Sequence, residues 1–153
     1  MQQKITPYLW FDDQAEEAAA HYTAIFKNSQ ITQVVPGPEG RALLVHFELD
    51  GQPFVALNGG PAFRFTEAIS LFVDCADQAE VDELWNRLVE GGAESQCGWL
   101  KDRYGLSWQI IPRTLMELMS DPDPVKAGRV TEAMLGMRKI DVQALRDAYD
   151  GTA

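Results

Sequence analysis

The sequence predicts an α+β fold of two similar β-α-β-β modules, each with room for a third β-strand after its helix, followed by C-terminal helices. The two modules are expected to assemble into one curved sheet or a cleft. A repeated motif indicates the modules: an apolar run, Leu9–Asp12 or Leu71–Asp74, leads into an acidic helix start, Asp13–Glu16 or Asp77–Glu80. Strand-like runs follow both helices, which favours an α+β fold over a doubly wound sheet. After Pro112 the pattern becomes helical.

In the first module, a strand around residues 9–12 precedes an amphipathic helix. Its apolar face is formed by Ala15, Ala18, Ala19, Tyr22, Ile25 and Phe26. Strands are then expected at roughly 30–35, 42–49 and 53–58, with Asp50-Gly51 as a hairpin turn between the last two.

The second module repeats this order. Its helix has Val81, Leu84, Trp85 and Leu88 on one face and ends at Gly91-Gly92. Strands at roughly 94–100 and 106–111 are joined around Arg103–Gly105. Both module helices begin with an acidic variant of the capping box, Asp13 with Glu16 and Asp77 with Glu80.

The C-terminal region is predicted to be a helical appendage, because about 40 residues are too few for an independent core. Thr114–Glu117 is a capping box that opens a short helix, and Asp121–Pro124 ends it. A helix from about 125 to 138 follows, and Asp141 caps the last one. The expected domains are 1–113, with modules of about 1–62 and 63–113, and the appendage 114–153.

Composition and charge limit the partners. Thirteen Lys and Arg against 23 Asp and Glu give a net charge of −10, and no basic cluster occurs, so we expect no nucleic-acid binding. No apolar run reaches the ~18 residues of a membrane span, and residues 1–4 do not begin a signal peptide. Cys75 and Cys97 lack CxxC spacing, which favours buried thiols in a cytoplasmic protein. The net charge favours a cationic ligand, although a local site could bind an anion.

Three stretches carry a family resemblance: Pro7–Phe11 with Ala15–Ala18, then Ala56–Pro61, then Cys97–Gln109. Together, and in this order, they resemble the PhnB-like branch, often labelled demethylubiquinone methyltransferase-like, of the vicinal-oxygen-chelate superfamily. That superfamily includes glyoxalases, extradiol dioxygenases and bleomycin-resistance proteins. The resemblance covers almost the whole chain and implies paired β-α-β-β(-β) modules that form a cupped mixed sheet around a cavity, commonly in a homodimer.

The resemblance also implies where a metal would be bound. Matching the strands places Thr6 and Ala68 where histidines are expected, and Asn58 (or its same-face neighbour Ala56) and Gln109 where acidic ligands are expected. None of these side chains is a carboxylate or an imidazole. We therefore expect neither a bound metal nor another cofactor.

Other candidates for chemistry have simpler structural explanations. His46 and Glu48 share a strand face and could hold a metal, but two ligands are too few, so polar residues on an exposed face are the competing interpretation. Cys97 lies near Lys101, yet no histidine neighbours it in sequence.

A methyltransferase cofactor site normally has a glycine-rich turn that opens a helix. Gly59–Pro61 precedes no helix, and Gly91-Gly92 ends one. In the appendage, methionines could line a partner surface or pack a helix face. They are Met116, Met119, Met134 and Met137.

The strand periodicity predicts a small-molecule pocket, with a filled core as the alternative. The expected ligand-binding residues are Tyr8, Trp10, Asn58, Ser70 and Gln109, and the amides of Asn58 and Gln109 are expected to face one shared cavity. The predicted function is metal-independent binding or sequestration of a small molecule by a homodimer. The alternative is an enzyme: a lyase or dioxygenase with atypical metal ligands, or a methyltransferase.

Overall fold

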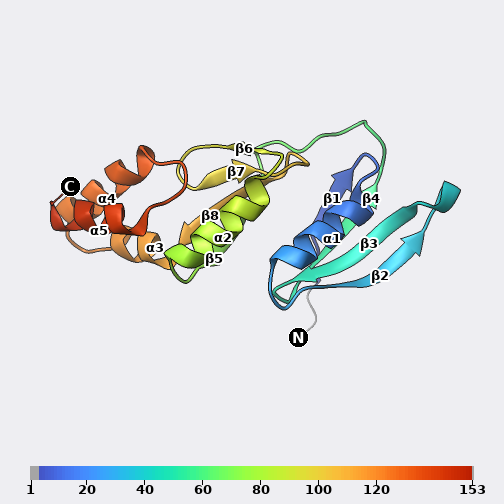
Figure 1. Cartoon of the computed structure of the whole chain (residues 1–153), viewed down its shortest axis with the longest axis horizontal. Coiled ribbons are helices and arrows are strands. Elements are labelled where there is room, and N and C mark those ends of the chain that lie inside the picture. The colour runs from blue at the N-terminus through green and yellow to red at the C-terminus, as the bar shows by residue number, and fades with distance from the viewer. Residues whose placement is uncertain (1–3, 153) are drawn as a thin grey trace. The chain divides into compact units, whose positions relative to one another are not determined.

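Two structural units follow each other along the chain in the computed structural model, which describes residues 4–152. The first unit ends at Phe65 and the second begins at Thr66. Figure 1 labels their helices and strands. Each unit has its own sheet, and each is described by itself.

The first unit is a four-stranded mixed sheet covered on one face by a helix. Its elements are β1 (Tyr8–Phe11), α1 (Ala15–Ile25), β2 (Gln30–Pro36), a 3₁₀ turn (Pro38–Gly40), β3 (Ala42–Leu49) and β4 (Gln52–Asn58). The strand order is β1-β4-β3-β2, with β1 parallel to β4 and the other pairs antiparallel. Tyr22 of α1 packs near Phe47, which stacks on Phe54, and all three side chains are buried.

The second unit repeats this topology and then continues into three helices. Its elements are β5 (Ser70–Cys75), α2 (Gln78–Val89), β6 (Ala93–Glu94), β7 (Trp99–Lys101), β8 (Ser107–Pro112), α3 (Arg113–Met119), α4 (Pro124–Leu135) and α5 (Val142–Asp150). The order is β5-β8-β7-β6, with β5 parallel to β8. The α+β class and the duplicated β-α-β-β-β pattern are thereby confirmed.

The helix starts agree with the sequence in some places only. At α2, the Asp77 carboxylate accepts from the Glu80 N–H at 3.0 Å, as in a capping box, while Glu80 accepts from the N–H of Ala76, the residue before the cap, at 2.7 Å. Asp141 caps α5 as predicted. The predicted box at α1 is wrong, because Glu16 instead accepts from the Ala42 N–H at 2.9 Å. Thr114 caps nothing, because α3 already begins at Arg113.

The C-terminal helices share a core with the end of the second sheet. This core consists of the buried side chains Ile111, Leu115, Val130, Ile140 and Leu145. Of the four methionines singled out in the sequence of this region, Met119, Met134 and Met137 pack against it. Met116 is exposed. The N–H groups of Cys97 and Gly98 donate to the carbonyls of Met137 and Arg138, both at 2.8 Å. The packing interpretation therefore holds for three methionines. Within residues 4–152, no helix has the length and hydropathy needed to span a bilayer.

Candidate functional site: the helix-free face of the second sheet

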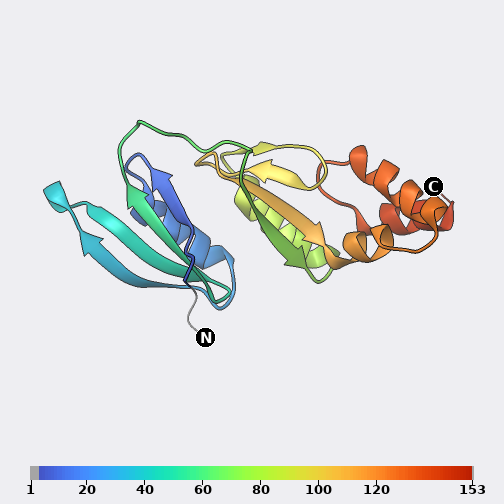
Figure 2. The same ribbon diagram turned by 180° about the vertical axis from the view of Figure 1, so that it is seen from behind.

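One face of the β5–β8 sheet is covered by α2, and the other face carries no helix of its own unit. Trp108, Ile110 and Leu100 point toward α2 and are fully or almost fully buried. Because side chains alternate along a strand, their neighbours in sequence lie on the opposite face. Figure 2 shows this helix-free face, with α2 behind the strands.

Two rows of side chains cross the helix-free face. The strand register places Ser107 of β8 between Ser70 of β5 and Lys101 of β7, and it places Gln109 of β8 between Phe72 of β5 and Trp99 of β7. Phe72 is 50% exposed, and Trp99 and Gln109 are half-buried. The face therefore combines two aromatic side chains with a short polar strip, which is the composition of a small-molecule site.

The polar strip is only partly satisfied by its own hydrogen bonds. Gln109 Nε2 donates to Ser70 Oγ at 2.9 Å, which joins two of the residues expected from the sequence to bind a ligand. The Ser107 hydroxyl is buried and has no hydrogen-bond partner among the described residues. Lys101 Nζ lies 2.9 Å from Glu67 Oε1, and hydrogen bonding to Lys101 lowers the pKa of that carboxyl. The face thus holds a buried hydroxyl that a polar ligand atom could satisfy.

The first sheet also has a helix-free face, and it carries Tyr8 and Trp10. Tyr8 is 56% exposed. Trp10 is held in place: its Nε1 donates to the Gly60 carbonyl at 2.9 Å, and Phe63 meets its ring edge-on at 4.9 Å. A Cβ on Gly59 would lie 2.4 Å from the Trp10 ring, so glycine is required for this close approach.

Asn58 lies on the opposite face of its strand from the one that we expected. Its Oδ1 accepts from the Ala15 N–H and its Nδ2 donates to the Ala42 carbonyl, both at 2.9 Å, so the side chain caps α1 and ties it to β3. Trp10 and Phe72 are equivalent positions in the two repeats. Trp10 is paired with Leu57 and Phe72 with Gln109, so Leu57, not Asn58, is the first-unit equivalent of Gln109. Ala56, which was predicted to share the face of Asn58, does so and is fully buried, but that face packs on α1.

Comparison with known proteins identifies the family of the chain. The model of the 3-demethylubiquinone-9 3-methyltransferase family matches residues 3–111. The chain belongs to this family. The PhnB protein of Bacillus cereus is 34% identical, with a TM-score of 0.68 over 72% of this chain and 99% of that chain. The predicted PhnB-like resemblance is thereby confirmed.

Two less similar solved structures share the fold. A Pseudomonas aeruginosa protein is 21% identical, with a TM-score of 0.62 over 72% of this chain and 98% of that chain. The fosfomycin resistance protein FosX of Listeria monocytogenes, crystallised with Mn(II) and sulfate, is 15% identical, with a TM-score of 0.53 over 71% and 89%. Among curated proteins, no match was found. The family match ends at residue 111, so α3, α4 and α5 lie beyond it.

The residues present do not fit the metal site that the superfamily implies. Of the matched positions, Asn58 is used to cap α1 and Gln109 is bonded to Ser70, and an amide is a poor substitute for a carboxylate. His46 and Glu48 are half-buried on the helix-free face of β3, as the polar-face interpretation expects. No three His, Cys, Asp or Glu side chains within residues 4–152 are grouped to hold a metal ion.

The buried Cys75 is not activated as a nucleophile. Both cysteines are free thiols. Burial, with smaller contributions from Glu80 and Asp74, raises the pKa of the Cys75 thiol to about 12, so it stays protonated at neutral pH. Cys97 is half-buried where the 96–98 loop meets the carbonyl of Met137.

The glycine pairs likewise do not form the strand–turn–helix arrangement of a nucleotide-type cofactor site. Gly59-Gly60 follows β4 and packs against Trp10, and no helix begins there. Gly92 lies against the backbone of Lys101 and Asp102 at the end of α2.

Asp102 supports the site from the α2 side of the sheet. It is 2% exposed, and its carboxylate accepts from the Tyr104 and Leu106 N–H groups at 2.9 and 3.1 Å and from Trp108 Nε1 at 2.9 Å. These bonds fix the turn that joins β7 to β8, the strands that carry Trp99, Lys101 and Gln109. The sequence predicted that the two strands are joined around Arg103–Gly105, but it did not predict this set of bonds.

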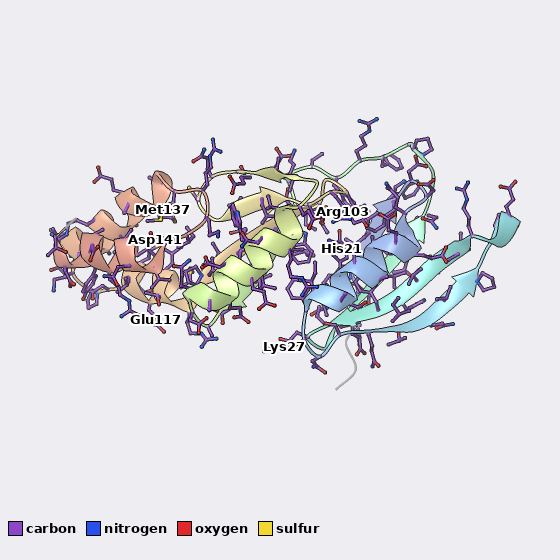
Figure 3. The ribbon with its side chains drawn as sticks, viewed as in Figure 1. His21, Lys27, Arg103, Glu117, Met137 and Asp141 are labelled. Atoms are coloured by element: carbon purple, nitrogen blue, oxygen red, sulfur yellow. The ribbon has the colours of Figure 1, made fainter. Side chains whose placement is uncertain are left out.

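A separate depression lies on the other side of the second unit. It has a volume of about 520 Å³ and lies beside the start of α5, where Gln78 accepts from the Val142 N–H and donates to the Ile140 carbonyl. Asp82 and Lys139 form an ion pair at its wall, 3.3 Å apart. Figure 3 shows Asp141 in this region, on the side of α2 where the C-terminal helices lie. Its polar groups are bonded to one another, which makes it a weaker candidate than the helix-free face.

Proposed function

We propose that this protein binds a small organic molecule on the helix-free face of the β5–β8 sheet, without a metal, and acts by binding or sequestering it. The observation that carries the proposal is the Ser70–Gln109 hydrogen bond flanked by the exposed Phe72 and the half-buried Trp99. Phe72 and Trp99 stand on the strands on either side of Gln109. Neighbouring strands are about 4.8 Å apart, so the two side chains start roughly 10 Å from each other, wide enough for a flat ring.

The polar atoms define the ligand further. Gln109 Oε1 is left as an acceptor and the Ser70 hydroxyl as a donor once they have bonded to each other, so a ligand with both a carbonyl and an N–H or O–H group is matched. Tyr8 and Trp10 stand on the helix-free face of the first sheet and are proposed as ligand contacts of that unit by itself. Asn58 is not proposed as a direct contact, because both ends of its amide are already bonded.

A second candidate is the methyl transfer that the family description names. A demethylubiquinone ring is flat and carries oxygens, so it is also the kind of ligand that this face fits. The two functions are distinguished by incubating the protein with such a ring and S-adenosylmethionine. A methylated product favours the enzyme, whereas binding without product favours sequestration. Metal analysis after dialysis tests the third possibility, a metal-dependent enzyme such as a lyase or dioxygenase.

Substitution of Gln109 tests the proposed site. A thermal-shift screen of metabolites and antibiotics supplies ligands, since one present at about 100 times its Kd stabilises by about 2.7 kcal/mol. We expect Gln109→Leu to weaken binding of the best ligand about fivefold or more, because a polar ligand group left without its hydrogen-bond partner costs about 1–3 kcal/mol.

Gln96→Leu is the matched control, because Gln96 is an exposed glutamine of the same unit in the loop before β7. It should bind the ligand as the unmodified protein does. Equal affinities of Gln109→Leu and Gln96→Leu would remove the proposed site.

We also propose that the protein is a homodimer in the cytoplasm. Exposed aromatic side chains on the helix-free faces, Tyr8 and Phe72, support self-association, and two free thiols support a reducing compartment. Light scattering at micromolar concentration should give twice the chain mass of 17.1 kDa. A mass of one chain would contradict the dimer.

A further inference from the structure

The row of Ser70, Ser107 and Lys101 contains groups that the proposed binding of a flat ring does not use. Ser107 is 1% exposed, and its hydroxyl has no partner among the described residues. A buried hydroxyl without a hydrogen bond is unfavourable in the free protein. Lys101 lies directly across from Ser107 on the neighbouring strand, so both side chains stand on the same face.

We infer that Ser107 and Lys101 form a carboxylate subsite, so that the ligand of this face is an aromatic acid. This inference rests on the proposed function and specifies the chemical class of its ligand. Ser107 supplies a hydroxyl donor and Lys101 a positive charge, and an ammonium-to-carboxylate hydrogen bond is among the stronger ones in proteins.

The spacing of the two rows fits such a molecule. Residues two apart on a strand lie about 6.6 Å apart on the same face, so the row of Phe72, Gln109 and Trp99 is next to the row of Ser107 and Lys101. A ring between the aromatic side chains therefore places a carboxylate attached to it above Ser107. The Ser70 hydroxyl, already bonded to Gln109, lies at the other end of the same row.

In the free protein, Lys101 forms an ion pair with Glu67. Its carboxylate is 2.9 Å from Lys101 Nζ, and the two side chains are 63% and 42% exposed. Such exposed ion pairs are weak, so a better-placed carboxylate from a ligand can displace Glu67. This local exchange explains how an acid could bind to a protein with a net charge of −10.

Benzoate and its neutral counterpart benzamide are the probes that separate charge from shape. Titrations followed by amide NMR should give a Kd for benzoate at least tenfold lower than for benzamide. Lys101→Met should remove this preference, so that the Kd values for benzoate and benzamide become similar. Lys126→Met is the matched control, because it changes the net charge equally in the same unit while Lys126 lies over the Tyr149 ring.

Two further variants distinguish a binding role from a structural one. Glu67→Gln removes the competing carboxylate and should bind benzoate several-fold more tightly. Ser107→Ala should bind benzoate several-fold more weakly while its thermal midpoint stays the same or rises, because the removed hydroxyl has no bond to lose.

The outcomes separate this inference from the proposed function. Equal affinities for benzoate and benzamide, both lowered by Gln109→Leu, would overturn the carboxylate subsite and leave the binding face in place. Failure of benzoate to shift the signals of residues 70, 72, 99, 101, 107 and 109 would also overturn the inference. The binding face itself is then judged by the ligands from the thermal-shift screen.

Discussion

Replacing Asp102 with alanine is expected to destabilise the second unit by about 3–5 kcal/mol, which is a large part of the roughly 5–15 kcal/mol that stabilises an ordinary domain. The carboxylate accepts from the Tyr104 and Leu106 N–H groups and from the Trp108 indole, and the substitution leaves the last two donors buried without this acceptor. Since the same bonds set the turn between β7 and β8, Trp99 and Gln109 should also lose their alignment.

Chemical denaturation followed by tryptophan fluorescence measures this loss. Glu132→Ala is the control, because Glu132 is an exposed carboxylate on α4 of the same unit. A change below about 1 kcal/mol for Asp102→Ala would show that the turn does not depend on this carboxylate.

Gly92→Ala is the second substitution with a large expected effect, a destabilisation of about 2–4 kcal/mol. A Cβ at this position would lie 2.0 Å from the Lys101 carbonyl oxygen and 2.7 Å from the Asp102 carbonyl carbon, and both are backbone atoms of the neighbouring strand or its end. Relief of the clash requires a backbone shift at Gly92 or at the end of β7, which carries Trp99 and Lys101, so ligand affinity should fall along with stability.

Gly128→Ala is the matched control for this prediction. Gly128 lies within α4, and a Cβ added there would meet no atom within 4 Å outside the backbone of its own helix. Alanine should therefore stabilise the helix by about 0.5–1 kcal/mol. Thermal unfolding of the two variants should shift in opposite directions. A Gly92→Ala protein as stable as the unmodified one would contradict the close packing of Gly92 against the end of β7.

The fold was predictable because its determinants are local. Alternation of apolar residues indicated the long strands, and Asp50-Gly51 adopts the positive φ angles of 49° and 80° that a tight hairpin requires. Helix starts were predictable only where the cap is local, as at Asp77. The cap of α1 comes from Asn58, 43 residues away from Ala15, and no local pattern reveals such a bond.

The site was predictable in part for the same reason. The alternation of side chains along each strand placed Ser70 and Gln109 on the pocket-facing side, and the structure brings the two within hydrogen-bond distance. Asn58 was assigned to the wrong face of the sheet because an alignment error of one residue moves every side chain of a strand to the opposite face. The residue that pairs with Trp10 is Leu57.

The sequence did not identify Trp99 and Lys101 as residues of the candidate site. Their strand has only three residues, too short for alternation to be visible, although pairing across the 102–106 turn would have placed them beside Gln109 and Ser107.

The most direct test of the proposed binding face is a two-dimensional amide NMR map of the protein with a ligand found by the thermal-shift screen. We predict that the largest shifts fall on β5, β7 and β8 at Ser70, Phe72, Trp99 and Gln109, with small shifts on α2. The largest shifts on α2, or around the depression near Asp82 and Lys139, would contradict the proposed site.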